Sequence, residues 1–216
     1  MIQWYKADNP QAQFIFAHGA GAGMDSEFMQ KMAGLLCNKQ INVGLFNFEY
    51  MQKIKAEGKR RPPERTDKLL TYFDEILAQA AKESDLPLFI GGKSMGGRMA
   101  SMIVSDKTYL EHDIVSSVKG VIVFGYPFHP PGKPDKLRTA HFPDLNCLLS
   151  VMQGQRDIFG TESEVSVMKL ADNIQLNWLP DGDHSLIPRK KSGFTQEQNW
   201  ISAAEKAVDF INEQLS

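Results

Sequence analysis

The residues with the clearest chemical meaning form a short glycine-rich segment in the middle of the chain. The sequence GKSMGG at residues 92–97 places Ser94 two residues after one glycine and two residues before another. This G-x-S-x-G spacing is typical of a sharp strand-to-helix turn, which lifts a serine hydroxyl above the edge of a sheet. A plain tight turn or a phosphate loop would also be rich in glycine, but neither G-x-x-x-x-G-K-[ST] nor G-x-G-x-x-G occurs in the chain. We therefore predict that Ser94 is a nucleophile.

A serine nucleophile needs a base within hydrogen-bond reach, and the base needs an acid to orient it. At a turn of this kind the expected chain order is serine, acid, histidine. Asp157 and His184 follow that order, and each comes directly after a predicted strand. Asp181 and Asp183 are rival acids, but residues so near His184 in sequence would hardly reach the far side of its ring. We assign Asp157 as the acid and His184 as the base, with a turn or capping role as the alternative for the histidine.

Acyl transfer also requires N–H donors for the negative charge that develops on the carbonyl oxygen. The backbone amide of Met95, directly after the nucleophile, is one predicted donor. The second is predicted to be the amide of Ala20, in the HGAGAG segment at residues 18–23. Glycine runs are usually only turns, but this one follows the first predicted parallel strand, where an oxyanion loop belongs.

Apolar patterning predicts how these residues are brought together. Short apolar runs alternate with amphipathic helices, which predicts an α/β protein with a mostly parallel central sheet of about six to seven strands and helices on both faces. Residues 1–6 are expected to add one antiparallel edge strand. In such a sheet ligands bind beyond the carboxyl ends of the strands, where the candidate residues lie. The predicted strands are 14–17, 42–48, 88–90, 118–124, 147–152 and 174–179, and the predicted helices are 26–36, 66–82, 95–104, 162–170 and 196–215.

Composition excludes several classes of protein. The chain has 216 residues with 24 basic and 26 acidic side chains, so it lacks the basic excess of a nucleic-acid-binding domain. Its two cysteines are far apart and show no metal-ligand spacing, which is typical of a reducing compartment. It has no signal-peptide pattern and no apolar run of the ~20 residues that cross a bilayer. We expect a single cytoplasmic domain over residues 1–216, with no metal, cofactor, nucleic-acid or membrane partner; the sequence does not indicate an oligomeric state.

Together, the GKSMGG segment, the early His18-Gly19 loop, Asp157 and His184 resemble the α/β-hydrolase superfamily. The segments HGAGAGMDSEFM, GYPFHPPGKPDKLRTAHF and PDGDHSL are similar to its small, lidless, dienelactone-hydrolase-like branch, which includes the testis-expressed and non-specific-lethal-complex hydrolase-like proteins. The resemblance covers nearly the whole chain and implies a Ser/Asp/His hydrolase. Dienelactone hydrolases proper carry a cysteine where this chain has Ser94, and some relatives act as scaffolds.

Residues 125–143 lie where this superfamily commonly inserts a lid domain. A loop longer than about 15 residues is usually functional, but this one is too short for a helical lid. We therefore expect an open site without a lid domain, and we expect Tyr126, Phe128 and His129 to line an acyl pocket. A packed surface loop is the alternative. Basic side chains cluster near the predicted strand ends, so an anionic substrate is an alternative to a neutral one. These side chains are Arg60, Arg61, Arg65, Lys93, Arg98, Lys133, Arg138 and Arg156.

These residues favour a serine hydrolase that cleaves a small carboxylic ester or thioester through an acyl-enzyme. A catalytically silent binding or scaffold protein is one alternative, although a scaffold has no need of all three triad groups. A peptidase or C–C hydrolase on the same fold is another, although peptide cleavage often demands additional binding elements.

Overall fold

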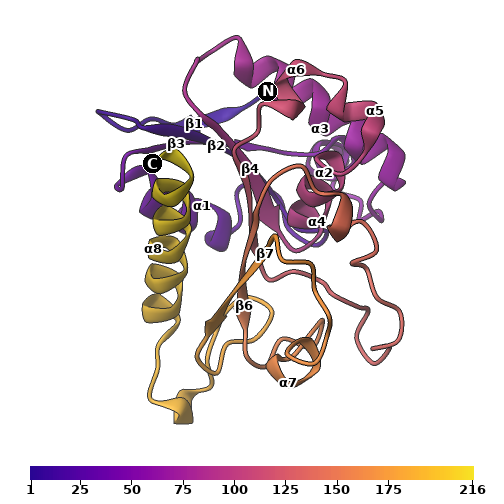
Figure 1. Ribbon diagram of the computed structural model, residues 1–216, viewed down its shortest axis with the longest axis vertical. Coiled ribbons are helices and arrows are strands. Elements are labelled where there is room, and N and C mark those ends of the chain that lie inside the picture. The colour runs from indigo at the N-terminus through magenta and orange to yellow at the C-terminus, as the bar shows by residue number, and fades with distance from the viewer.

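A seven-stranded sheet runs through the centre of the molecule. The computed structural model describes residues 1–216. The strand order is β1-β3-β2-β4-β5-β6-β7; β1 is antiparallel to β3 and every other neighbouring pair is parallel (Figure 1). The predicted parallel sheet and its antiparallel edge strand are thereby confirmed. The strands are β1 (Gln3–Tyr5), β2 (Ala12–Ala17), β3 (Ile41–Phe46), β4 (Leu88–Lys93), β5 (Gly120–Phe124), β6 (Leu149–Gly154) and β7 (Ile174–Leu179).

Helices cover both faces of this sheet, and each face has its own apolar core. One core packs against α1 and α8, and the other packs mainly against α3 and α4 (Figure 1). Every residue of β2, β4, β5 and β6 is buried, because a parallel strand covered on both faces has no solvent side. The helices are α1 (Glu27–Cys37), α2 (Glu49–Glu57), α3 (Thr66–Ala81), α4 (Met95–Ile103), α5 (Lys107–Leu110), α6 (Asp113–Ser116), α7 (Glu162–Val165) and α8 (Gln196–Leu215), with 3₁₀ turns at Phe142–Asp144 and Lys190–Ser192.

Four helices differ from the expectation: α2, α5 and α6 were not predicted, and α7 is shorter than predicted. Helix α2 was not predicted, because only Tyr50 and Met51 of its nine residues are buried and its pattern is therefore weak. Helix α7 begins at a capping box formed by Thr161 and Glu164 but ends at Val165, not near residue 170 as predicted. Val167 is 81% exposed, so the apolar residues after the helix end do not form a continuous buried face.

The topology brings separate loops to one edge of the sheet. Because β2, β4, β6 and β7 are parallel, the segments that follow them all leave from the same side. These are the segments that carry Ala20, Ser94, Asp157 and His184. Between β5 and β6, residues 125–148 contain one 3₁₀ turn and no other helix, and no lid domain is inserted there. None of the helices combines the length and the apolar character that a membrane span requires.

Candidate active site

Ser94 stands on a strained turn between β4 and α4. Its backbone has φ 52° and ψ −113°, a conformation that residues other than glycine rarely adopt. The turn is so tight that a Cβ atom on Gly96 would collide with the carbonyl oxygen of Ala17 on the neighbouring strand. The chain therefore needs glycine at this position, and the strain at Ser94 holds the hydroxyl above the sheet edge.

The hydroxyl of Ser94 begins a continuous chain of hydrogen bonds. Its Oγ lies 2.8 Å from Nε2 of His184, and Nδ1 of the same ring lies 2.7 Å from Oδ2 of Asp157. A neutral imidazole with its proton on Nδ1 satisfies both contacts, donating to the carboxylate and accepting from the hydroxyl. Three side chains from distant parts of the sequence thus form the arrangement in which a histidine removes a serine proton.

Asp157 is held in place by hydrogen bonds other than the one from His184. It is completely buried, and its Oδ1 accepts a hydrogen bond of 2.8 Å from the amide of Phe159. Its Oδ2 accepts a second bond, of 2.9 Å, from Nε2 of Gln153. Gln153 is also buried, on β6, and it donates to the carbonyl oxygens of Tyr126 and Gly160 as well. The carboxylate is therefore held by a protein framework and not by solvent.

The surroundings of His184 favour its neutral form. Burial lowers the pKa of the imidazole below its ordinary value, and the hydrogen bond to Asp157 opposes that shift. The positive charge of Lys93 lowers the pKa further. Phe159 covers the ring, with 4.3 Å between the ring centroids. A neutral imidazole is the form that accepts a proton, so these surroundings suit a general base.

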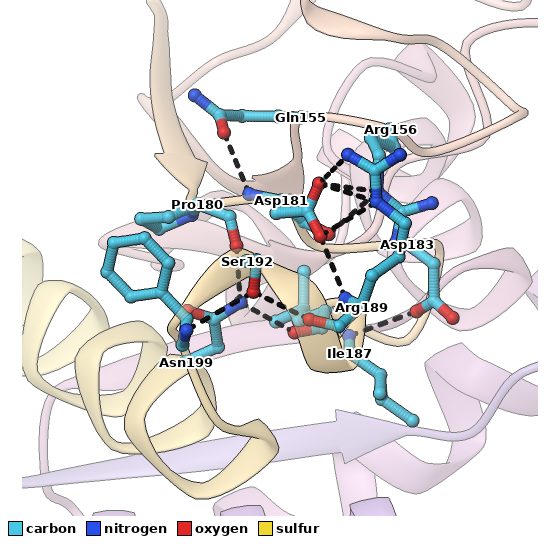
Figure 2. Close-up of polar contacts among 11 residues, drawn as sticks. Gln155, Arg156, Pro180, Asp181, Asp183, Ile187, Arg189, Ser192 and Asn199 are labelled. Carbon is cyan, nitrogen blue, oxygen red and sulfur yellow. Dashed lines mark hydrogen bonds and ion pairs between the residues drawn. The ribbon is translucent and has the colours of Figure 1, made fainter.

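The loop that carries His184 is braced on both sides of the histidine. Oδ1 of Asp183 accepts the amides of Ser185 at 2.8 Å and Ile187 at 3.0 Å, which closes a turn around the histidine. Asp181 contacts Arg156 and Arg189 at the base of the loop (Figure 2). The two aspartates that rivalled Asp157 in the sequence thus hold the loop, and neither of them contacts the imidazole.

Helix α8 holds the same loop from the other side. The side-chain amide of Asn199 donates to the carbonyl oxygens of Pro180 and Leu186, each at 2.9 Å (Figure 2). Trp200 donates its indole N–H to the carbonyl oxygen of Ser185 at 2.9 Å. Leu186 itself has φ 65°, so the loop keeps a sharp left-handed bend two residues after the histidine.

The glycine-rich loop after β2 lies beside Ser94 and has unpaired backbone donors. The amide of Ala20 makes no hydrogen bond within the chain, whereas its carbonyl oxygen accepts one of 3.1 Å from the hydroxyl of Tyr50. The loop is further fixed by His18, whose Nδ1 lies 2.7 Å from the carbonyl oxygen of Gly19 and whose Nε2 accepts the amide of Phe48 at 3.1 Å. Met95 is the first residue of α4, and the amides of a first helical turn have no partner within the helix.

A cavity of about 480 Å³ opens beside Ser94 and His184. Its walls are mostly apolar and come from the loop after β2, the start of α1, the His184 loop and the start of α8. Glu27 and Lys93 are the only charged side chains among its lining residues. The large side chains that line it are Phe28, Met29, Phe159, Ile187 and Trp200.

Tyr126, Phe128 and His129 do not line this cavity, so the expectation that they form the acyl pocket was wrong. All three are buried: Tyr126 and Phe128 belong to the apolar core that packs against α3 and α4, and their rings contact each other with centroids 4.9 Å apart. The physical reason is that the segment after β5 turns onto the face of the sheet opposite the cavity. The hydroxyl of Tyr126 donates to the carbonyl oxygen of Arg138 at 2.8 Å, which closes the loop on itself.

Several residues that contact the candidate site were not predicted from the sequence. Gln153 had a usable signal, because it is a polar residue at the end of the apolar strand β6. Phe28 and Trp200 were assigned to the buried stripes of their helices; both are nearly buried, yet both also line the cavity. Lys93 was counted only as one of several basic residues. No group of three or more His, Cys, Asp or Glu side chains is arranged to hold a metal ion.

Comparison with known proteins identifies the class of protein that this fold represents. A family model described as "Alpha/beta hydrolase domain" matches residues 10–212. The chain therefore belongs to the α/β-hydrolase family, as its motifs indicated.

Solved structures share the fold at low sequence identity. A dienelactone hydrolase from Anabaena variabilis superposes with a TM-score of 0.68 at 16% identity, over 97% of this chain and 89% of that chain. Est1E from Butyrivibrio proteoclasticus, solved with ferulic acid bound, gives a TM-score of 0.68 at 13% identity, over 100% and 95% of the two chains. A monoacylglycerol lipase from Paleococcus ferrophilus gives 0.62 at 12% identity, over 97% and 99%. At these identities the likeness establishes the fold.

Proposed function

We propose that the protein is a serine hydrolase that cleaves small carboxylic esters or thioesters through an acyl-enzyme. The observation that carries the proposal is the hydrogen-bond chain from Ser94 through His184 to Asp157, with distances of 2.8 Å and 2.7 Å. The proposed hydrolase domain takes in the whole chain, residues 1–216, since β1 and β7 form the opposite edges of one sheet.

In the proposed reaction, Oγ of Ser94 attacks the substrate carbonyl carbon while Nε2 of His184 takes the hydroxyl proton. The amides of Met95 and Ala20 donate to the oxyanion that forms. The tetrahedral intermediate collapses when His184 returns the proton to the leaving alcohol or thiol. Water, deprotonated by His184 in turn, then releases the acid from Ser94. Asp157 keeps the imidazole in the required tautomer and stabilises its positive form.

The lining of the cavity favours an uncharged substrate. Of the eight basic residues that suggested an anionic ester, only Lys93 lines the cavity, and one acidic side chain, Glu27, lines it as well. Among the other large lining side chains, Gln196 is polar but uncharged, and Phe28, Met29, Phe159, Ile187 and Trp200 are apolar or aromatic. We propose a short aliphatic or a small aromatic acyl group, for which such walls supply contact area without a requirement for charge.

The test is labelling with a fluorophosphonate probe, which reacts with activated serines. We expect the wild type to be labelled, and Ser94→Ala and His184→Ala to lose the label while keeping a wild-type circular-dichroism spectrum. Ser101→Ala is the matched control, because Ser101 also lies 2.8 Å from a histidine nitrogen, that of His141, but is completely buried. An unlabelled but folded wild type would overturn the proposal and favour the silent binding protein.

Hydrolysis of p-nitrophenyl esters then tests the substrate class. Neutral acetyl, butyryl and benzoyl esters are expected to be cleaved faster than succinyl esters of similar size. Equal rates on neutral and anionic esters, independent of added salt, would contradict the proposed preference.

A further inference from the structure

Lys93, the residue before the nucleophile, has a buried side chain with an unusual setting. It is only 9% exposed, although it lines the cavity beside Ser94. Its Nζ donates a hydrogen bond of 2.5 Å to the backbone carbonyl oxygen of His184 and lies 5.7 Å from the centre of the Phe28 ring. None of the ion pairs in the protein includes it. Buried lysines are normally paired, so this unpaired ammonium needs an explanation.

The groups that face Lys93 are those of the candidate site. Burial lowers the pKa of Lys93 to about 8, and the charges of Asp157 and Asp183 oppose that shift. Glu27 lines the same cavity from α1, and His184 lies on the loop that the ammonium contacts. Lys93 therefore stays mostly protonated at neutral pH and deprotonates in mildly alkaline solution.

The ammonium acts on His184 in two ways. Its hydrogen bond holds the histidine backbone against the end of β4, and its charge repels the second proton that would make the imidazole positive. Gly125 lies close to both groups, because a Cβ atom on it would lie 2.9 Å from Nζ and 3.3 Å from Nδ1 of His184. The charge is thus kept at a fixed place close to the imidazole.

We infer that Lys93 is a positioning residue for His184, one that anchors the histidine loop and, by its charge, keeps the imidazole in the proton-accepting form. This inference rests on the proposed function, since it assigns Lys93 a part in the same reaction. The amine does not touch the reacting atoms in this arrangement, and it acts through the histidine.

The test is an NMR titration of the His184 imidazole in the whole protein, with His184→Asn used to assign its signal. In wild type we expect the titration midpoint below that of an ordinary histidine and a second, smaller step near pH 8, where Lys93 loses its proton. Lys93→Met removes the charge, so the midpoint should rise by about 0.5 to 1 pH unit and the second step should vanish. The acidic limb of the rate of fluorophosphonate labelling should move upward by the same amount.

Three further variants keep the test decisive. Lys93→Gln is also uncharged and serves if the methionine variant fails to fold; its midpoint should rise as well. Lys93→Arg keeps the charge in an altered geometry, so its midpoint should stay near the wild-type value even if the rate falls. Lys119→Met is the matched control, because it removes one exposed lysine that directly precedes β5, at the end of the strands opposite to the candidate site.

The outcomes separate this inference from the proposed function. A midpoint unchanged in both uncharged variants would overturn the role of the charge, and a loss of thermal stability alone would indicate a packing residue. A midpoint that rises in a protein that no fluorophosphonate labels would support the electrostatic effect and overturn the proposed hydrolase activity.

Discussion

The two faces of the sheet beside Ser94 carry similar aromatic side chains, which border a cavity on one face and fill a core on the other. On the side of α1 and α8, the aromatic rings of Phe28 and Trp200 border an open cavity. On the side of α3 and α4, the rings of Tyr126, Phe128 and Phe142 pack against one another and leave no comparable space. The cavity is framed by the loops after β2 and β7 and by the starts of α1 and α8. The segment after β5 instead packs its aromatic rings into the apolar core.

The side of α3 and α4, called here the filled side, nevertheless supports the side of α1 and α8, called the cavity side, through one side chain. Gln153 accepts the amide of Tyr126 at 2.7 Å and donates to Asp157 at 2.9 Å. The packed segment therefore fixes the acid of the candidate triad, while the cavity side provides the room for substrate. We expect substitutions on the cavity side to change turnover and substrate choice, and substitutions on the filled side to change stability.

The largest expected effect is that of Asp157→Asn on the cavity side. An amide keeps the shape of the carboxylate, but it donates toward Nδ1 and so favours the tautomer that cannot accept the serine proton. We expect turnover of a p-nitrophenyl ester to fall by about 10⁴-fold. Asp183→Asn is the control: it removes a charge from the His184 loop without contacting the ring and should lose far less activity. Comparable losses in the two variants would mean that Asp157 is not the orienting acid.

Phe128→Ala tests the filled side. Phe128 is completely buried against Tyr126 and Phe142, so truncation should lower the free energy of unfolding by about 3 to 5 kcal/mol. Urea denaturation measures this loss. The kcat of the fraction that remains folded should stay within a few-fold of wild type. If KM for long-chain esters changed strongly while stability did not, Phe128 would belong to the substrate pocket after all.

The wrong assignment of Phe128 shows what the sequence could predict and what it could not. The parallel sheet, the turn at Ser94 and the order of Ser94, Asp157 and His184 follow from local patterns, because strand ends and sharp turns have local signatures. The face onto which residues 125–143 fold depends on contacts with distant helices, and no local pattern encodes it. The positions of Phe28 and Trp200 on the cavity wall were not predicted for the same reason. An apolar stripe on a helix does not reveal which of its residues border a cavity.

Acid should destabilise both sides through one histidine on each: His18 is buried and His141 is partly buried. Burial lowers the pKa of His18, near the cavity, and of His141, on the filled side, to about 4. The unfolded chain takes up these protons near pH 6.5, so the stability that each neutral histidine contributes is complete above that pH and is lost as the pH falls toward 4. For His18 the loss between pH 7 and pH 5 should be about 2 kcal/mol; His141, which is less buried, should contribute less.

Urea denaturation across this pH range measures the loss, and a variant separates the two histidines. In His141→Gln the amide side chain can still donate to Ser101, which His141 contacts at 2.8 Å, but it does not titrate. The slope of stability against pH should therefore be smaller than in wild type and still present, because His18 and His184 remain. A slope equal to that of wild type would show that His141 does not resist protonation in the folded protein.

Ile187→Ala gives the smallest expected effect and sharpens the comparison most. Ile187 lines the cavity on the loop that carries His184, and its amide, which the substitution preserves, is bonded to Asp183. Removing its side chain lengthens the cavity without moving the base, so selectivity should change more than rate. We expect kcat/KM for hexanoyl relative to acetyl esters to rise by about 10-fold, the difference that a few apolar contacts supply. Val165→Ala truncates a buried aliphatic side chain in the apolar core that also contains Phe128, and it should leave that ratio unchanged. If both variants changed the ratio equally, the cavity would not be the acyl site. The proposed difference between the cavity side and the filled side would then be wrong.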